Sequence, residues 1–253
     1  MTLKFLGTGT STGVPILTCQ CAVCTSPDPH DKRTRPSILL EYDGRAVLID
    51  TTPDFRAQAL REGMTRLDAV VFTHHHADHI MGLDDTRMFY FRQQTPIPIY
   101  ADARCMATLR TVFAYIFDGN YLFGGVGKID PHLIDGPFDL WGLKLIPVPV
   151  LHGNLTILGF RVRDAAYLTD VSEVPESSFP LLADLDVLII DALRHKPHPT
   201  HLSLTQALAM VERLKPERAF FTHIAHELGH EQTNSILPAN VRLAYDGLQV
   251  EIS

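Results

Sequence analysis

The sequence predicts an α/β protein, and three observations indicate this class. Apolar strand-like runs alternate with helix-like stretches along the chain. Several of these runs end in His or Asp, and open α/β sheets place their sites at the carboxyl ends of their strands. No linker, low-complexity tract or internal repeat marks a boundary within residues 1–253, so we expect a single domain.

The first half of the chain is expected to form strands and helices in turn. Asp43-Gly44 divides the apolar residues 37–50 into two runs, which is a strong β-hairpin signal. Residues 2–6 are expected to form a strand that leads into the loop GTGTSTGVP. The other expected elements of this half are a helix over 54–64, a strand over 68–74, a strand over 97–102 and a helix over 103–116.

The second half repeats the alternation, with strands expected over 143–153, 157–170 and 184–193. Ser203 with Gln206 three residues later is a capping-box pattern, which predicts a helix from about Ser203 to Leu214. Residues 218–226 are expected to form a last buried strand. The tail over 241–252 is expected to form a hairpin around Asp246-Gly247.

Composition limits the classes of function. Hydrophobic residues make up 45% of the chain and charged residues 20%, which is an ordinary globular balance. The N-terminus does not resemble a secretory signal, and the apolar run over 186–190 is far below the roughly 20 residues of a membrane span. No membrane is therefore expected as a partner. The formal charge is −7 with no basic block, so nucleic acid is not expected as a partner either. We expect a cytoplasmic protein in which bound metal supplies the positive charge for any phosphate.

The segment His74-His75-His76-Ala77-Asp78-His79 follows an apolar strand-like run. Alternate side chains of an extended chain point to the same side, so His74 and His76 can reach one metal. As the chain turns, Asp78 and His79 can point to a second metal. Imidazole and carboxylate ligands suit zinc, manganese or iron. A polar surface loop is the alternative, but further candidate ligands downstream favour a metal site.

Those downstream candidates are His152, Asp170 and His223, and each ends a strand-like run. Any one of them alone is more simply a hydrogen-bonded strand-end residue. Together with the motif of residues 74–79 they favour a metal centre.

This order of motifs resembles the metallo-β-lactamase superfamily, whose fold is a four-layer αββα sandwich. The resemblance runs from Gly7 to Asp246. It implies two metal sites that share one bridging aspartate. The implied ligands are His74, His76 and His152 for one metal, Asp78, His79 and His223 for the other, and Asp170 as the bridge. Asp50 resembles the aspartate of the family that orients ligating histidines.

The implied chemistry is phosphodiester hydrolysis. Two metals about 3.5–4 Å apart can share a bridging water, lower its pKa and produce a hydroxide that attacks phosphorus. His201, in PTHLSLTQA, resembles the His-x-Ser segment of the phosphodiesterase branch, and we predict that it is the general acid for the leaving group. A solvated loop histidine is the alternative, because His195 and His198 lie nearby.

Cys19, Cys21 and Cys24 lie within six residues, a spacing that one structural zinc accepts. His30 is the nearest histidine, but His226 is the better fourth ligand. The pattern C-x-C-x2-C with a distant T-H-x-x-H resembles the PhnP-like phosphodiesterases that accompany carbon–phosphorus lyase and carry such a zinc. We therefore predict a zinc-binding Cys loop at about 17–30, in addition to two active-site metals.

The resulting prediction is a two-metal phosphodiesterase that acts on a small or cyclic nucleotide or sugar-phosphate diester, with a homodimer as one expected assembly. One alternative is a tRNA 3′-processing endoribonuclease, although no Lys/Gly-rich arm is present. Another is a role like that of the pyrroloquinoline quinone B protein, which typically lacks an intact HxHxDH motif. The loop Gly7–Gly13 is either a tight turn, which we prefer, or a phosphate contact.

Overall fold

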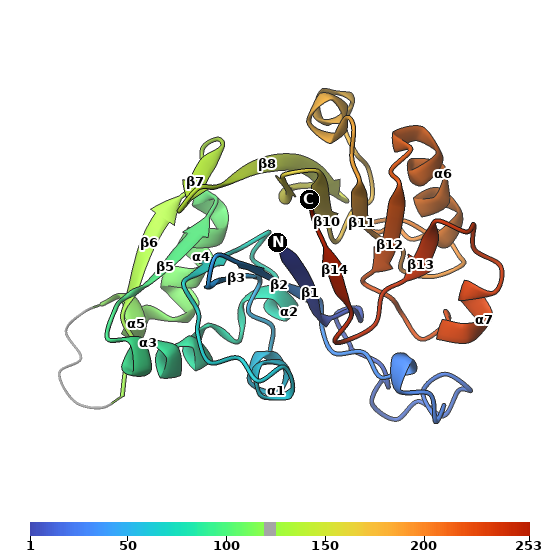
Figure 1. The fold of residues 1–253 in the computed structure, drawn as a ribbon. Coiled ribbons are helices and arrows are strands. Elements are labelled where there is room, and N and C mark those ends of the chain that lie inside the picture. Colours follow the sequence, from blue (N-terminus) through green and yellow to red (C-terminus); the bar gives the residue numbers. More distant parts are fainter. Residues whose placement is uncertain (119–124) are drawn as a thin grey trace.

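Two seven-stranded sheets form the centre of the fold (Figure 1). The structure is a computed structural model that describes residues 1–118 and 125–253. The first sheet has the order β14-β1-β2-β3-β4-β5-β6, antiparallel from β14 to β3 and parallel from β3 to β6. Its strands are β1 (Thr2–Gly7), β2 (Ser37–Tyr42), β3 (Arg45–Ile49), β4 (Ala69–Val71), β5 (Ile97–Ala101), β6 (Ile129–Leu133) and β14 (Gln249–Glu251).

The second sheet has the order β13-β12-β11-β10-β9-β8-β7. It is antiparallel from β7 to β10 and parallel from β10 to β13. Its strands are β7 (Phe138–Leu140), β8 (Leu143–His152), β9 (Leu155–Val162), β10 (Ala165–Leu168), β11 (Val187–Asp191), β12 (Arg218–Thr222) and β13 (Val241–Leu243).

Helices lie on the outer faces of the two sheets (Figure 1). The α-helices are α1 (Phe55–Arg61), α2 (Ala77–Ile80), α3 (Arg87–Gln93), α4 (Ala103–Val112), α5 (Ala114–Phe117), α6 (Leu204–Leu214) and α7 (His230–Asn234). The 3-10 helices are η1 (Pro29–Asp31), η2 (Leu83–Thr86) and η3 (Glu176–Leu182). No helix of the described residues combines the length and the apolarity that a membrane crossing requires.

Among the residues that the structure describes, three hydrophobic clusters hold the layers together, which confirms the αββα arrangement. The middle cluster joins the inner faces of the sheets, with Phe5 and Leu40 from one and Phe160 and Ile189 from the other, all buried. A second cluster packs α1, α3 and α4 on the first sheet. A third packs α6 on the second sheet. Burial of a Leu or Phe side chain contributes about 1.5–3 kcal/mol.

Most of the predicted elements are present, including the hairpin of β2 and β3 and the capping box of Ser203 and Gln206 at the start of α6. The helix predicted over 103–116 is interrupted at Phe113, which separates α4 from α5. The prediction missed α2, α3, α7, β6 and β7. The single strand predicted over 157–170 is wrong, because the chain turns after Val162 and forms the antiparallel pair β9 and β10. Strand β6 lies at a sheet edge and contains Pro131, and proline in a sheet is tolerated there.

The predicted hairpin of the tail is wrong. β13 pairs with β12 in the second sheet, whereas β14 pairs with β1 in the first. Asp246 therefore lies in a crossover between the sheets. Its carboxylate accepts hydrogen bonds from the backbone N–H groups of Thr8 and Thr34, at 3.0 and 2.8 Å, and from Arg61 at 3.2 Å. These long-range contacts fix the position of the segment, although the dipeptide Asp246-Gly247 alone predicted a local hairpin turn.

Candidate metal centre

His74, His76 and His152 form the first group of candidate metal ligands. His74 and His76 follow β4, and His152 ends β8, so the two sheets each contribute to the group. One ligand atom from each of the three residues lies within 4.8 Å of the others. The ring centroids of His74 and His76 are 4.6 Å apart, and those of His76 and His152 are 5.1 Å apart.

Asp78, His79, Asp170 and His223 form the second group within the same 4.8 Å limit. Nε2 of His79 lies 3.2 Å from Asp170 Oδ1 and 3.4 Å from Asp78 Oδ2. Nε2 of His223 lies 3.3 Å from Asp170 Oδ2. The same Asp170 oxygen is 3.9 Å from Nε2 of His74, so this carboxylate faces both groups.

The residues fit a pair of cations. Among the residues that the structure describes, Nε2 of His74, of His79 and of His223 are buried and have no hydrogen-bond partner. Burial alone would lower the pKa of His223, yet Asp170, Asp78 and Asp191 raise it to about 9. The negative carboxylates thus stabilise the protonated, positively charged form of a buried ring. A bound cation offsets the same negative charge. Imidazole and carboxylate donors suit zinc, manganese or iron.

Hydrogen bonds fix the orientation of these rings. Asp50 Oδ2 lies 2.7 Å from Nδ1 of His79 and also accepts the hydroxyl proton of Thr73, at 2.8 Å. The Thr73 hydroxyl oxygen is then left to accept from Nδ1 of His74, at 3.0 Å. Nδ1 of His152 donates to the Thr200 carbonyl at 2.8 Å. Each of these contacts occupies Nδ1 and leaves Nε2 for a metal, which is the arrangement expected of ligating histidines.

His201 lies beside both groups, since its ring centroid is 4.6 Å from that of His223 and 4.7 Å from that of His152. Its Nδ1 is 2.7 Å from Oδ2 of Asp191, and this oxygen also accepts from the backbone N–H of Val171. Sequence reasoning missed Asp191. The signal was present, because Asp191 ends the strand run VLIID much as Asp50 ends VLID.

The four predicted ligands of the Cys loop lie together. Nδ1 of His226 is 3.3 Å from Sγ of Cys19 and 3.5 Å from Sγ of both Cys21 and Cys24. Ideal tetrahedral zinc with thiolate and imidazole ligands gives nitrogen–sulfur separations of roughly 3.6 Å. The cluster therefore has the dimensions of a Cys3His zinc site, and its His226 lies three residues beyond His223.

The Gly7–Gly13 loop offers few free backbone donors. The N–H groups of Gly9, Thr10 and Gly13 donate to carbonyls within the protein, and that of Thr8 donates to Asp246. A Cβ on Gly9 would lie 2.8 Å from the Arg33 carbonyl oxygen, so a side chain does not fit there. These contacts favour a tight turn over a phosphate loop.

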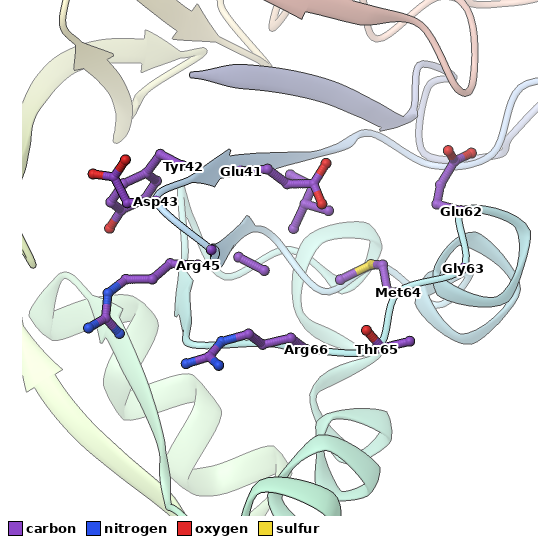
Figure 2. A pocket seen from close by; sticks show the side chains of 12 residues that line it. Glu41, Tyr42, Asp43, Arg45, Glu62, Gly63, Met64, Thr65 and Arg66 are labelled. Carbon is purple, nitrogen blue, oxygen red and sulfur yellow. The ribbon is translucent and has the colours of Figure 1, made fainter.

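A groove of about 440 Å³ lies at the turn between β2 and β3, where β3 begins, whereas the metal groups lie beyond the ends of β3 and β4 (Figure 2). Figure 2 shows Glu41 and Glu62 above this groove and Arg45 and Arg66 below it. Lys4 lies within 4 Å of both glutamates, and both arginines lie within 4 Å of Asp68. Because its charges are paired and it lies away from the carboxyl ends of β3 and β4, the groove is not a substrate site for the metal groups.

Comparison with known proteins agrees with this geometry. Residues 45–224 match the family model of the beta-lactamase superfamily domain. A solved structure described as a new diphosphatase from the PhnP family is 50% identical, with a TM-score of 0.94, over 100% of this chain and 98% of that one. Zinc-bound PqqB from Methylobacterium extorquens covers 100% of both chains at 21% identity and a TM-score of 0.80, which shows the shared fold alone.

A protein named octanoyltransferase from Porphyromonas gingivalis is 38% identical over 251 residues. The match takes 98% of this chain but 51% of that protein, so the chain spans about half the length of this relative.

The fold and the site define a metal-dependent hydrolase of the metallo-β-lactamase superfamily. Within that class, the chain belongs to the PhnP family.

Proposed function

We propose that this hydrolase cleaves small phosphoric diesters, with cyclic or nucleotide-like esters and diphosphate diesters as the substrate class. The observation that carries the proposal is the Asp191–His201 pair beside the two groups of candidate ligands. Hydrolysis of a phosphodiester requires a proton for the departing alkoxide, and a paired histidine next to the centre can provide it. The PhnP-family neighbour described as a diphosphatase supports the same class.

The proposed ligands are His74, His76 and His152 for one cation and Asp78, His79 and His223 for the other, with Asp170 between them. When bound, the two divalent cations would activate water and offset charge on the phosphoryl oxygens. Thr73, Asp50 and the Thr200 carbonyl occupy Nδ1 of His74, His79 and His152, and this leaves Nε2 of these three rings for a cation.

The Asp191–His201 pair is arranged to donate a proton. Burial raises the pKa of the Asp191 carboxyl, and burial together with His223 lowers the pKa of His201 to about 3. Both shifts favour a pair with no net charge. A pair with no net charge contains two protons, whether it consists of a carboxylic acid and an imidazole or of a carboxylate and an imidazolium. One proton lies between the carboxyl group and Nδ1, and the other is on Nε2. Nε2–H is then the donor to the leaving oxygen.

The test is a panel of substrates with metal-loaded protein, comprising a linear diester, a 2′,3′-cyclic nucleotide, a diphosphate diester, precursor tRNA and an acyl thioester. We expect turnover of small phosphoric diesters and a loss of at least about 10³-fold in Asp170→Ala. Failure to cleave any small diester, or equal turnover by Asp170→Ala, would contradict the proposal. Selective cleavage of precursor tRNA would instead favour the endoribonuclease alternative.

A homodimer and a cytoplasmic location belong to the same proposal. Light scattering of the purified protein tests the first, and fractionation of cells tests the second. Three unpaired thiols at candidate zinc ligands support a reducing compartment.

A further inference from the structure

A further group of metal-ligand side chains lies outside the two groups around Asp170 and outside the Cys3His cluster. His30, His230 and Glu231 each place one ligand atom within 4.8 Å of the others. His30 lies in η1 at the end of the Cys loop, whereas His230 and Glu231 begin α7. His30 is the histidine closest in sequence to the three cysteines, yet His226 occupies the position beside them.

The His230 ring has an unused nitrogen. His230 is 6% exposed, and its Nδ1 is buried without a hydrogen-bond partner in the part of the chain that the structure describes. A buried donor or acceptor left unpaired is destabilising, so a ligand that pairs with it would be stabilising. The centroid of the His30 ring lies 4.5 Å from that of His230 and 4.1 Å from that of Tyr245, and both ring pairs are tilted.

Hydrogen bonds fix the position of the segment that contains His30 relative to the segment that contains His230 and Glu231. Asp31 Oδ1 accepts from the backbone N–H of His230 at 2.9 Å and from Nη2 of Arg33 at 3.1 Å. Arg33 is 1% exposed and also donates to the carbonyls of His30, at 3.2 Å, and of Leu228, at 2.8 Å. The backbones that carry the three side chains are therefore fixed relative to each other, and less ordering is needed to bind a ligand.

We propose that His30, His230 and Glu231 bind a further divalent cation of the zinc type. Two imidazoles and one carboxylate form a donor set that suits zinc and related borderline metals and does not suit magnesium or calcium, which prefer oxygen ligands. Asp28 Oδ1 lies 3.6 Å from Nδ1 of His30 and can orient that ring. Glu231 is exposed, so water completes the coordination. The cation joins the end of the Cys loop to α7.

Native mass spectrometry of the full chain, titrated with zinc to saturation, tests this site by counting bound ions. We expect the wild type to bind one more zinc ion per chain than His30→Gln and His230→Gln, or to bind that ion at least tenfold more tightly. His132→Gln, which changes a partly exposed histidine of β6, is the matched control and should retain the wild-type count.

His30 is partly exposed, so His30→Gln keeps the test valid if His230→Gln fails to fold. Equal zinc counts and equal affinities in the wild type and His30→Gln would overturn the proposal. The count does not depend on turnover, so the result is independent of the proposed phosphodiesterase activity.

Discussion

Three residues of the proposed centre adopt a left-handed backbone conformation at the end of a strand. Asp50, Asp170 and His223 have φ values of 68°, 58° and 57°. A residue with a Cβ in this region costs about 1 kcal/mol or more, and such residues cluster at functional sites. The turn directs each side chain out of the strand and toward the cluster. The backbone of the centre is therefore a source of strain that packing around it must offset.

Asp50→Asn should weaken the group of Asp78, His79, Asp170 and His223. The carboxylate of Asp50 accepts from Thr73 and contacts Nδ1 of His79, and an amide cannot reproduce all these contacts. Loss of such a partner typically costs 10–100-fold in metal affinity. Competition with a chromophoric chelator measures the effect. An affinity unchanged within twofold would show that Asp50 does not support His79.

Asp191→Asn should impair the proposed proton donor more than the binding of substrate. We expect kcat to fall by about 10²-fold for a diester with a poor alkoxide leaving group, with little change in KM. A diester with a p-nitrophenolate leaving group needs little protonation and should lose much less. Equal losses on both substrates would argue against a proton-donor role for the Asp191–His201 pair.

At the scale of elements, the sequence predicted the parts of the site that follow strands. His152 and His223 end or directly follow apolar strands, and HxHxDH follows another, so periodicity alone located them. Grouping them around two metals required the resemblance to a family, because spacing does not determine which strand ends meet. Asp191 was missed because its role depends on His201, which lies in a loop ten residues later.

The tail over 241–252, by contrast, is a part of the fold that the sequence did not predict correctly. Asp246-Gly247 has the local chemistry of a hairpin turn, but β13 and β14 belong to different sheets. Contacts of the Asp246 carboxylate with Thr8, Thr34 and Arg61 decide the outcome, and their partners are 185 to 238 positions away in sequence. No local sequence pattern indicates interactions between residues so far apart in the sequence. Tertiary contacts here override the turn propensity.

The Cys loop should depend on each of its thiols to hold a zinc ion. Cys21→Ser should remove about one zinc ion per chain and lower the melting temperature, because Sγ of Cys21 lies 3.5 Å from Nδ1 of His226. Elemental analysis and calorimetry measure both effects. Cys105→Ala is the matched control, since Cys105 is buried in α4 away from the Cys loop and should leave the zinc content unchanged. A full zinc count in Cys21→Ser would refute the structural site.

At the scale of the whole molecule, the two sheets converge on one centre. The first sheet supplies Asp50 and the residues after β4, and the second supplies the ends of β8, β10, β11 and β12. The shared hydrophobic core between the inner faces fixes the distance between these strand ends. Destabilising that core should therefore loosen the metal groups as well as the fold.

The assembled centre should release protons when cations bind, because of the charge on its histidines. In the metal-free protein, the neighbouring carboxylates raise the pKa of His79 well above its usual value and that of His223 to about 9, although burial opposes both shifts. Both rings therefore hold a second proton at pH 7, whereas burial lowers the pKa of His74, of His76 and of His152. A cation binds only the neutral ring, so loading must displace the protons.

With the Cys loop already filled with zinc, we expect loading of the centre at pH 7 to release about two protons per chain. The number should decrease as the pH rises through about 9, where His223 loses its proton before any metal arrives. Calorimetry in buffers of different ionisation enthalpy counts the protons. Asp78→Asn removes one of the carboxylates that raise the pKa of His223, and it should shift the decrease to lower pH. A release near zero at pH 7 would mean that cations do not replace protons on these rings.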